Sequence, residues 1–244
     1  MSGTSLDGLD ACLVRETSDG SRIEVIQTLE TSFPEEVQQD LKQIIETGQT
    51  SLQDLLRVEN AYTDVVIEQC HRLMQTSLDP VSVIGFHGQT LWHDPNLGST
   101  LQIGFAERLA EETGVPVAHQ FRRGDMARGG QGAPLATLFH EAHFRRGTEN
   151  VAVLNLGGIA NISLLIPGKP ARGWDIGPAN TLADIWHQKH KKKPFDRDGA
   201  FASSGLVNHE LLDSLLDDPY FAKEPPKSTG REYFSCAWLE QTLR

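Results

Sequence analysis

The first residues of the chain have the composition of a loop that binds an anion. Within Ser2–Asp10, Gly3 and Gly8 stand among three hydroxyl side chains. Glycine lets the backbone approach a ligand closely, and successive N–H groups can form an anion-binding concavity. The segment therefore predicts either a phosphate loop or a hydroxyl-rich turn, and spacing alone does not decide between them. A Walker loop is excluded, because the GxxxxGK[ST] order and its lysine are absent.

A second pair of glycines, Gly157 and Gly158, lies between two apolar runs in the segment Asn155–Asn161. It offers a phosphate chain the same close backbone approach as the first loop. The alternative is an ordinary turn between two strands.

Asp175 is the carboxylate with the clearest catalytic potential, in the segment Gly173–Asn180. A carboxylate can accept the proton of a hydroxyl or water that attacks a terminal phosphorus. It can equally cap the first turn of a helix that starts near Pro178. Spacing alone favours the cap.

Two polar segments suit recognition of a sugar that bears a carboxylate. The first is Gly85–Thr90, followed by His93, and the second is Phe121–Asp125, followed by a glycine-rich stretch up to residue 134. Both combine hydrogen-bonding side chains with flexible backbone. Arg122 is suited to pair with the acid group of the sugar.

The histidines and acids do not show the spacing of a known metal site. One histidine pair is six residues apart and two pairs are three apart: His87/His93, His140/His143 and His187/His190. None gives HExxH or zinc-finger spacing. The acids around Gly199 lack the residue order of an EF-hand loop. We therefore expect no structural metal site.

The elements that must position these residues alternate between strand and helix. Residues 11–14 and 22–29 predict a hairpin with a turn at 18–20, and apolar periodicity predicts helices from Pro34 to Gly48 and over 55–73. Strands are expected at 81–86, 101–103 and 115–118, with a helix at 105–112. A second hairpin, 151–154 with 159–165, precedes helices near 179–186 and 211–216. This pattern is typical of an α/β fold.

The two hairpins suggest two related halves that face a cleft, joined by the glycine-rich, charged segment 121–134. We accordingly expect a first domain over residues 1–130, with the phosphate loop and part of the sugar pocket. The second domain, 131–244, would hold Asp175 and the second candidate phosphate loop.

Composition narrows the class of partner. The 244 residues include 33 acidic and 22 basic ones, a formal charge of −11, which argues against binding nucleic acid through its phosphates. Three scattered cysteines make neither a disulfide framework nor a CxxC metal site. The sequence has no apolar run of about 20 residues and no secretory signal at its start. We expect a cytoplasmic protein with a small-molecule partner and no membrane association.

Seven motifs, in order, resemble those of the anhydro-N-acetylmuramic acid kinase family and extend from residue 1 to about residue 240. They are MSGTSLDGLD, GFHGQTLWH, FRRGDMARGGQGAPL, NLGGIANI, GWDIGPAN, DRDGAFASSG and KSTGRE. The resemblance implies a two-domain actin-like (ribonuclease H-like) fold. It also implies a kinase of peptidoglycan recycling that uses ATP, Mg²⁺ and water on 1,6-anhydro-N-acetylmuramic acid. The sugar ring opens, O6 is phosphorylated, and the product is N-acetylmuramic acid 6-phosphate.

The same resemblance assigns roles to individual residues. Asp175 would deprotonate the water that attacks the anomeric carbon, which changes its target from phosphorus to carbon. His87, Thr90, Arg122 and Asp125 would form the sugar pocket. The residues expected to contact ATP are Gly3, Thr4, Ser5, Leu6, Asp7, Gly8, Leu9 and Asp10 of the phosphate loop, with Gly157 and Gly158. The magnesium ligands are not assigned, and a homodimer is left open.

Two features depart from the family pattern. Ile176 stands where the family usually has threonine, so one hydroxyl beside the expected base is missing. Family members also have further segments before the position of Met1 and after that of Arg244, including part of the second domain. We therefore expect a fold incomplete at its C-terminus, with weak or no kinase activity for the 244 residues. A non-catalytic remnant that binds sugar or nucleotide, and a phosphatase-like hydrolase on the same fold, are the alternatives.

Overall fold

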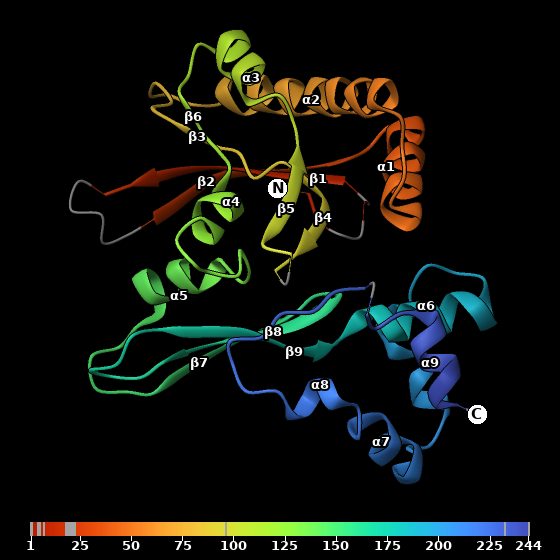
Figure 1. Ribbon diagram of the computed structural model, residues 1–244. Coiled ribbons are helices and arrows are strands. Elements are labelled where there is room, and N and C mark those ends of the chain that lie inside the picture. Colours follow the sequence, from red (N-terminus) through yellow and green to blue (C-terminus); the bar gives the residue numbers. More distant parts are fainter. Residues whose placement is uncertain are drawn as a thin grey trace. The chain divides into compact units, whose positions relative to one another are not determined.

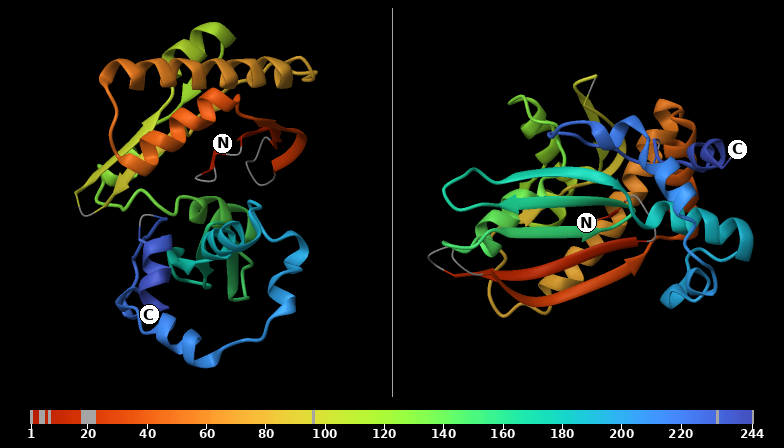
Figure 2. Two further views of the ribbon diagram at one scale, coloured as in Figure 1. Left: turned by 90° about the vertical axis from the view of Figure 1, so that its right-hand side faces the viewer. Right: turned by 90° about the horizontal axis from the view of Figure 1, so that it is seen from below.

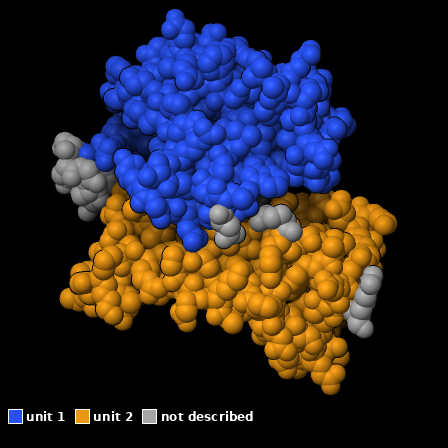
Figure 3. Space-filling model, viewed as in Figure 1, with its two compact units in different colours: residues 1–132 blue, residues 133–244 orange. Residues whose placement is uncertain are grey.

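A computed structural model describes residues 2–3, 6, 8–17, 23–95, 97–231 and 233–243. The chain divides into two compact units, residues 1–132 and 133–244 (Figure 3). Both units combine helices and strands, so the α/β class expected from the sequence is confirmed. That they are the two domains of an actin-like kinase remains a prediction.

The described residues of unit 1 form three small strand pairs and four helices, which are labelled in Figure 1. Strands β1 and β2 form an antiparallel hairpin, as expected, although the predicted turn at 18–20 and Arg22 lie outside the described residues. Strands β4 and β5 form a second hairpin, and β3 pairs with β6 in parallel. The elements are β1 Gly8–Glu16, β2 Ile23–Ser32, α1 Glu35–Thr47, α2 Leu52–Met74, β3 Ile84–Gly85, β4 Gln89–Asp94, β5 Ser99–Ile103, α3 Ala106–Thr113, β6 Val117–Ala118 and α4 Phe121–Met126.

The ends of the first two helices follow from local residue chemistry. Pro34 precedes α1, and Gly48 ends it in the left-handed region with a φ of 64°, where glycine has no steric penalty. The side chain of Ser51 then caps α2 by accepting a hydrogen bond from the N–H of Asp54, at 3.0 Å. Both helices agree with the sequence prediction.

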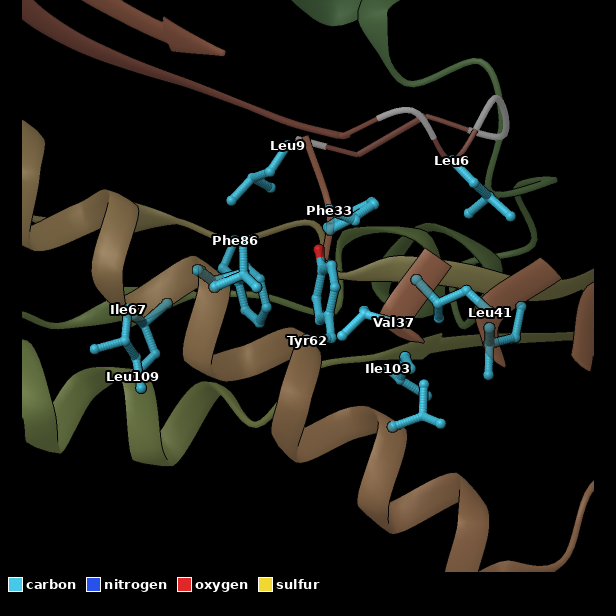
Figure 4. Packing of buried hydrophobic residues seen from close by; sticks show 14 of the residues in the cluster. Leu6, Leu9, Phe33, Val37, Leu41, Tyr62, Ile67, Phe86, Ile103 and Leu109 are labelled. Atoms are coloured by element: carbon cyan, nitrogen blue, oxygen red, sulfur yellow. The ribbon is translucent and has the colours of Figure 1, made fainter. Parts of the chain in front are cut away.

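The core of unit 1 forms where the helices pack against the β1–β2 hairpin. Tyr62 of α2 is fully buried, and Figure 4 shows its ring beside Phe33 and Phe86. The tyrosine hydroxyl lies 3.0 Å from Oγ of Ser2 in the opening loop. The hydroxyl of Ser2, which the sequence offered as a donor to an anion, is therefore engaged inside the protein.

Unit 2 is built on one antiparallel sheet with the order β7-β8-β9, seen side by side in the right-hand view of Figure 2. The expected β7–β8 hairpin is confirmed. Short turns of 3₁₀ helix lie at Arg197–Gly199 and Ala202–Ser204. The other elements are α5 Ala136–Phe144, β7 Val151–Leu156, β8 Ile159–Leu165, β9 Arg172–Pro178, α6 Asn180–Lys191, α7 His209–Leu216, α8 Pro219–Ala222 and α9 Cys236–Thr242.

Six α-helices and strands in the described part of the chain were not predicted from the sequence: α4, β4, α5, β9, α8 and α9. Strands β4 and β9 begin in polar or glycine-containing motifs, whose composition resembles a loop. They are strands because a neighbouring strand supplies the hydrogen bonds, β5 for β4 and β8 for β9. Pairing between strands has no signature in the local sequence. Among the described residues, no helix is both long and apolar enough to cross a membrane.

The packing of the unit 1 core can be tested at Gly104, where there is no room for a side chain. Gly104 has a φ of +131°, and a Cβ added there would overlap Cζ of Phe86 and lie 2.7 Å from its Cε1. We expect Gly104→Ala to lower the free energy of unfolding of unit 1 by about 2–4 kcal/mol, since overpacking and backbone strain add. Amide hydrogen exchange followed by mass spectrometry measures the loss.

The matched control is Gly85→Ala, because a Cβ at Gly85 would meet no atom within 4 Å. Equal exchange in the two variants would contradict the assigned packing.

Candidate active site

Asp175 lies within strand β9, opposite Asn161 of β8, and its side chain is buried with 7% of its surface exposed. Helix α6 begins only at Asn180, and Ala179 is its N-cap residue. The helix-cap role that spacing favoured is therefore wrong, and Pro178 ends a strand instead of starting a helix. The error arose because a Gly-Pro pair can equally follow a strand.

Residues 220–229 hold Asp175 at three points. Its backbone N–H donates to the carbonyl of Lys227 at 3.0 Å, and its carbonyl accepts from the hydroxyl of Tyr220 at 2.8 Å. The backbone N–H of Thr229 donates to the carboxylate oxygen Oδ2 at 3.0 Å. A hydrogen bond to a charged oxygen stabilises the negative charge. The carboxylate is thus fixed in position with one oxygen bound by an amide.

The hydroxyl of Tyr220 remains a donor at neutral pH. Burial, and to a smaller degree the negative charge of Asp175, raise the pKa of Tyr220 well above its usual value. An aromatic cluster around it includes Phe221, Tyr233, Phe234 and Trp238. Asp218 connects this cluster by accepting hydrogen bonds from the Tyr233 hydroxyl, at 2.8 Å, and from the Trp238 indole, at 2.7 Å.

The turn at Gly157 and Gly158 connects the sheet to the first residues of α6. The Gly158 carbonyl accepts from the N–H groups of Ala179 and Thr181 at 3.0 and 3.1 Å, and the Gly157 carbonyl accepts from Asn180 at 3.0 Å. A Cβ at Gly158 would lie 2.8 Å from Oγ1 of Thr181. Packing alone therefore already requires a small residue here, whether or not a phosphate also binds.

The predicted phosphate loop of unit 1 is described only in part, since Thr4, Ser5 and Asp7 lie outside the described residues. Leu6 has a φ of 60°, and its carbonyl accepts from Nε2 of Gln38 at 2.7 Å. The side chains of Leu6 and Leu9 are buried in the core. Any ligand contact of these two residues must therefore come from their backbone.

The remaining described residues of the loop lie on or beside the hairpin. Gly3 and Asp10 are exposed. Gly8 faces the backbone of β2, because a Cβ on it would overlap the carbonyl oxygen of Thr31. Close packing between two strands thus accounts for this glycine without any ligand.

Three of the four predicted sugar-pocket residues form one network in unit 1. Arg122 donates through Nε to Nε2 of His87 at 3.0 Å, and through Nη1 to the Gly132 carbonyl at 2.8 Å. The Gly132 N–H donates to Oδ2 of Asp125, also at 2.8 Å. The network orders the glycine-rich loop that follows α4. Two guanidinium nitrogens of Arg122 are therefore already used inside the protein.

His87 is held as the neutral Nδ1–H tautomer by its two partners. Its Nδ1 lies 2.8 Å from the Gly88 carbonyl, so it donates, while Nε2 accepts from Arg122. Burial first, and then the positive charge of Arg122, lower the pKa of His87. Burial and Arg122 also lower the pKa of the neighbouring His93.

Thr90 belongs to a different hydrogen-bonded row, on the β4–β5 hairpin. Its Oγ1 accepts from Nε2 of Gln102 at 3.3 Å, and the same nitrogen donates to Thr100 at 2.6 Å. Oγ1 of Thr100 lies 3.2 Å from Nδ1 of His93. Within the described part of the chain, no group of three or more His, Cys, Asp or Glu residues could hold a metal ion.

The residues that hold Asp175 have no distinguishing pattern in the local sequence. Tyr220, Lys227 and Thr229 lie 45 to 54 residues beyond it, and they meet it only in the fold. The available signal was the motif KSTGRE, residues 227–232, which carries the resemblance but received no role.

Comparison with known proteins finds relatives along the whole chain. The sequence profile of the family described as anhydro-N-acetylmuramic acid kinase matches residues 1–244. Curated proteins with that name are similar at 44% identity in Pasteurella multocida, 45% in Bordetella petrii and 43% in Pseudomonas putida. These matches cover 100% of this chain and 66%, 65% and 67% of the respective relatives. The chain thus spans about two thirds of the length of these relatives.

Among solved structures, the Aquifex aeolicus member of the Ppx/GppA family matches with a TM-score of 0.39 at 14% identity. The match covers 88% of this chain and 59% of that one. A likeness of that size carries no argument about fold or function.

We expect Tyr220→Phe to lower the free energy of unfolding of unit 2 by about 1–3 kcal/mol, because the hydrogen bond from the buried tyrosine hydroxyl to the Asp175 carbonyl is lost. Chemical denaturation measures the loss. Tyr233→Phe is the control, since its hydroxyl binds a carboxylate that keeps other donors. A Tyr220→Phe protein as stable as this control would contradict the importance of the contact.

The lowered pKa of His87 predicts a pH dependence of the stability of unit 1. The unfolded chain takes up a proton near the ordinary value of about 6.5, whereas the folded chain takes it up at lower pH. The contribution to stability is therefore complete above that ordinary value and is lost as pH falls through the folded pKa.

We expect His87→Gln, whose amide oxygen can still accept from Arg122, to flatten this acid-side loss of stability. His119→Gln, at an exposed histidine of the same unit, should leave it unchanged. Urea unfolding curves between pH 5 and pH 8 compare the two. A slope that His87→Gln leaves unaltered would exclude His87 as its source. Part of the slope should persist because of His93.

Proposed function

Because the chain belongs to the anhydro-N-acetylmuramic acid kinase family, we propose that it takes part in the ATP-dependent conversion of 1,6-anhydro-N-acetylmuramic acid to N-acetylmuramic acid 6-phosphate. The observation that carries the proposal is the buried carboxylate of Asp175, oriented by an N–H from Thr229. A general base has to be ionised and held still, and the contacts of Asp175 support both requirements.

The proposed reaction couples hydrolysis of a strained ring to phosphoryl transfer. Asp175 takes a proton from a water molecule as the water oxygen bonds to the anomeric carbon. The bond between that carbon and O6 breaks, and its electron pair stays on O6. O6 then attacks the γ-phosphorus of ATP, and ADP leaves. The base thus acts on water and not on a sugar hydroxyl.

The other sequence-predicted residues enter as binding groups. In unit 1 we assign the backbone of the loop 3–10 to the ATP phosphates, and His87, Thr90, Arg122 and Asp125 to the sugar pocket. Arg122 would also stabilise the pocket, because it donates hydrogen bonds to His87 and to the Gly132 carbonyl. In unit 2 we assign Gly157 and Gly158 to phosphate contact. The actin-like fold and a cytoplasmic location belong to the same proposal.

A magnesium ion coordinated mainly by phosphate oxygens and water would fit the ATP site proposed for these loops. In phosphoryl transfer it neutralises the phosphate charges, and it usually takes only one or two carboxylates from the protein. The exposed Asp10, in the loop assigned to the phosphates, is the kind of ligand required. An ion bound in this way needs no cluster of three protein ligands.

We expect Asp175→Asn to lower turnover by about 10²–10⁴-fold, because an amide cannot accept the proton of water. ATP and sugar affinities should stay within a few-fold, since amide and carboxylate have the same shape. A coupled assay for ADP with the anhydro sugar measures turnover, and titration calorimetry measures both affinities.

Asp213→Asn, at an exposed acid of α7, is the control and should keep the activity of the unaltered protein. A near-normal rate for Asp175→Asn would rule out Asp175 as the base. Binding of sugar or ATP without ADP release by the unaltered protein would favour the non-catalytic remnant.

A further inference from the structure

Two polar side chains of unit 2 point toward the same position above Gly158. A Cβ built on Gly158 would lie 2.8 Å from Oγ1 of Thr181, and 3.2 and 3.3 Å from Nη2 and Nε of Arg231. The hydroxyl and the guanidinium come from α6 and from the segment after α8, which are far apart in the sequence. Because glycine has no side chain, nothing of Gly158 itself separates them.

Thr181 has a hydroxyl that the fold leaves unsatisfied. Its side chain is buried with 3% of its surface exposed, and Oγ1 has no hydrogen-bond partner among the described residues. Its backbone N–H is already bonded to the Gly158 carbonyl at 3.1 Å. A buried hydroxyl without a partner costs free energy, so its presence beside the turn needs a compensating role.

Arg231 belongs to the short segment that also holds the proposed base. Two residues before it, the N–H of Thr229 donates to the Asp175 carboxylate at 3.0 Å. One segment thus orders Asp175 and places a positive charge at the Gly157–Gly158 turn. The charge of Arg231 also acts on Asp184 of α6: burial raises the pKa of Asp184, and the guanidinium opposes that rise.

We propose that Arg231, with the Thr181 hydroxyl, binds an oxygen of the nucleotide phosphate chain above Gly158. The inference rests on the proposed function and adds to it a side-chain contact for the second phosphate loop. Arginine suits this task because its planar guanidinium donates two parallel hydrogen bonds to phosphate and stays charged at all relevant pH values. Phosphate would also supply the acceptor that the Thr181 hydroxyl lacks.

The decisive experiment is titration calorimetry of Arg231→Gln with ATP and, separately, with inorganic tripolyphosphate. We expect both to bind about 10–100-fold more weakly than to the unaltered protein, as for loss of a charge-assisted hydrogen bond. Affinity for the anhydro sugar should be unchanged, and Arg231→Lys should recover part of the loss. Arg197→Gln, at another exposed arginine of unit 2, is the control and should have no effect.

Thr181→Val separates a binding role from a structural one. Valine has nearly the shape of threonine without the hydroxyl, so the thermal unfolding temperature should stay equal or rise, since an unsatisfied buried group is removed. Affinity for ATP and tripolyphosphate should nevertheless fall several-fold. If the hydroxyl had only a structural role, its loss would not lower the affinity for phosphate while leaving the unfolding temperature equal or higher.

Binding titrations test the phosphate contact of Arg231, whereas the ADP assay tests the proposed function. The inference is overturned if Arg231→Gln binds ATP and tripolyphosphate as tightly as the unaltered protein does. It is equally overturned if the unaltered protein binds neither, or if Arg231→Gln weakens sugar binding as much as ATP binding. The proposed function fails instead if ATP binds but no ADP forms with the anhydro sugar. In that case the titrations with ATP and tripolyphosphate still decide whether Arg231 contacts phosphate.

Discussion

The burial of the Asp175 carboxylate is the constraint on which much of unit 2 depends. A charged group taken out of water is costly unless hydrogen bonds replace its hydration. Here β9 is the last strand of its sheet, and residues 220–229 cover it while satisfying the N–H, the carbonyl and one carboxylate oxygen of Asp175. The position of that covering segment depends in turn on the aromatic cluster around Tyr220. The contacts that satisfy the buried carboxylate are thus the same ones that would orient it in the proposed role as a base.

Unit 1 applies the same principle to three half-buried groups: a neutral histidine, a cationic arginine and an anionic aspartate. His87, Arg122 and Asp125 would each be costly to bury alone, but together they bond to one another or to the backbone of Gly132. Such networks stabilise one arrangement of a loop because every member loses its partner if the loop moves. Three of the residues assigned to the sugar are therefore held by contacts within the protein, and such pre-organisation reduces the entropy lost on binding.

The glycines of the motifs show how packing and ligand binding can require the same residue. Gly8 lies against the Thr31 backbone, and at Gly130 a Cβ would overlap the Asp125 carboxylate. Neither needs a ligand to account for it. At Gly158 the neighbours of a Cβ would be the Thr181 hydroxyl and the Arg231 guanidinium. Packing thus accounts for all three glycines, and at Gly158 the proposed phosphate contact would add a second requirement for the same residue.

The sequence by itself determined the α/β class, the paired hairpins β1–β2 and β7–β8, the long helices of unit 1 and the family. These depend on local periodicity, on capping residues such as Ser51 and Gly48, and on ordered motifs, all of which can be read within short windows. It did not determine that Asp175 lies in a strand, that Tyr220 and Thr229 hold it, or that Arg231 reaches Gly158. Only the tertiary structure decided these points, because hydrogen bonds between residues about 50 positions apart leave no local pattern in the chain.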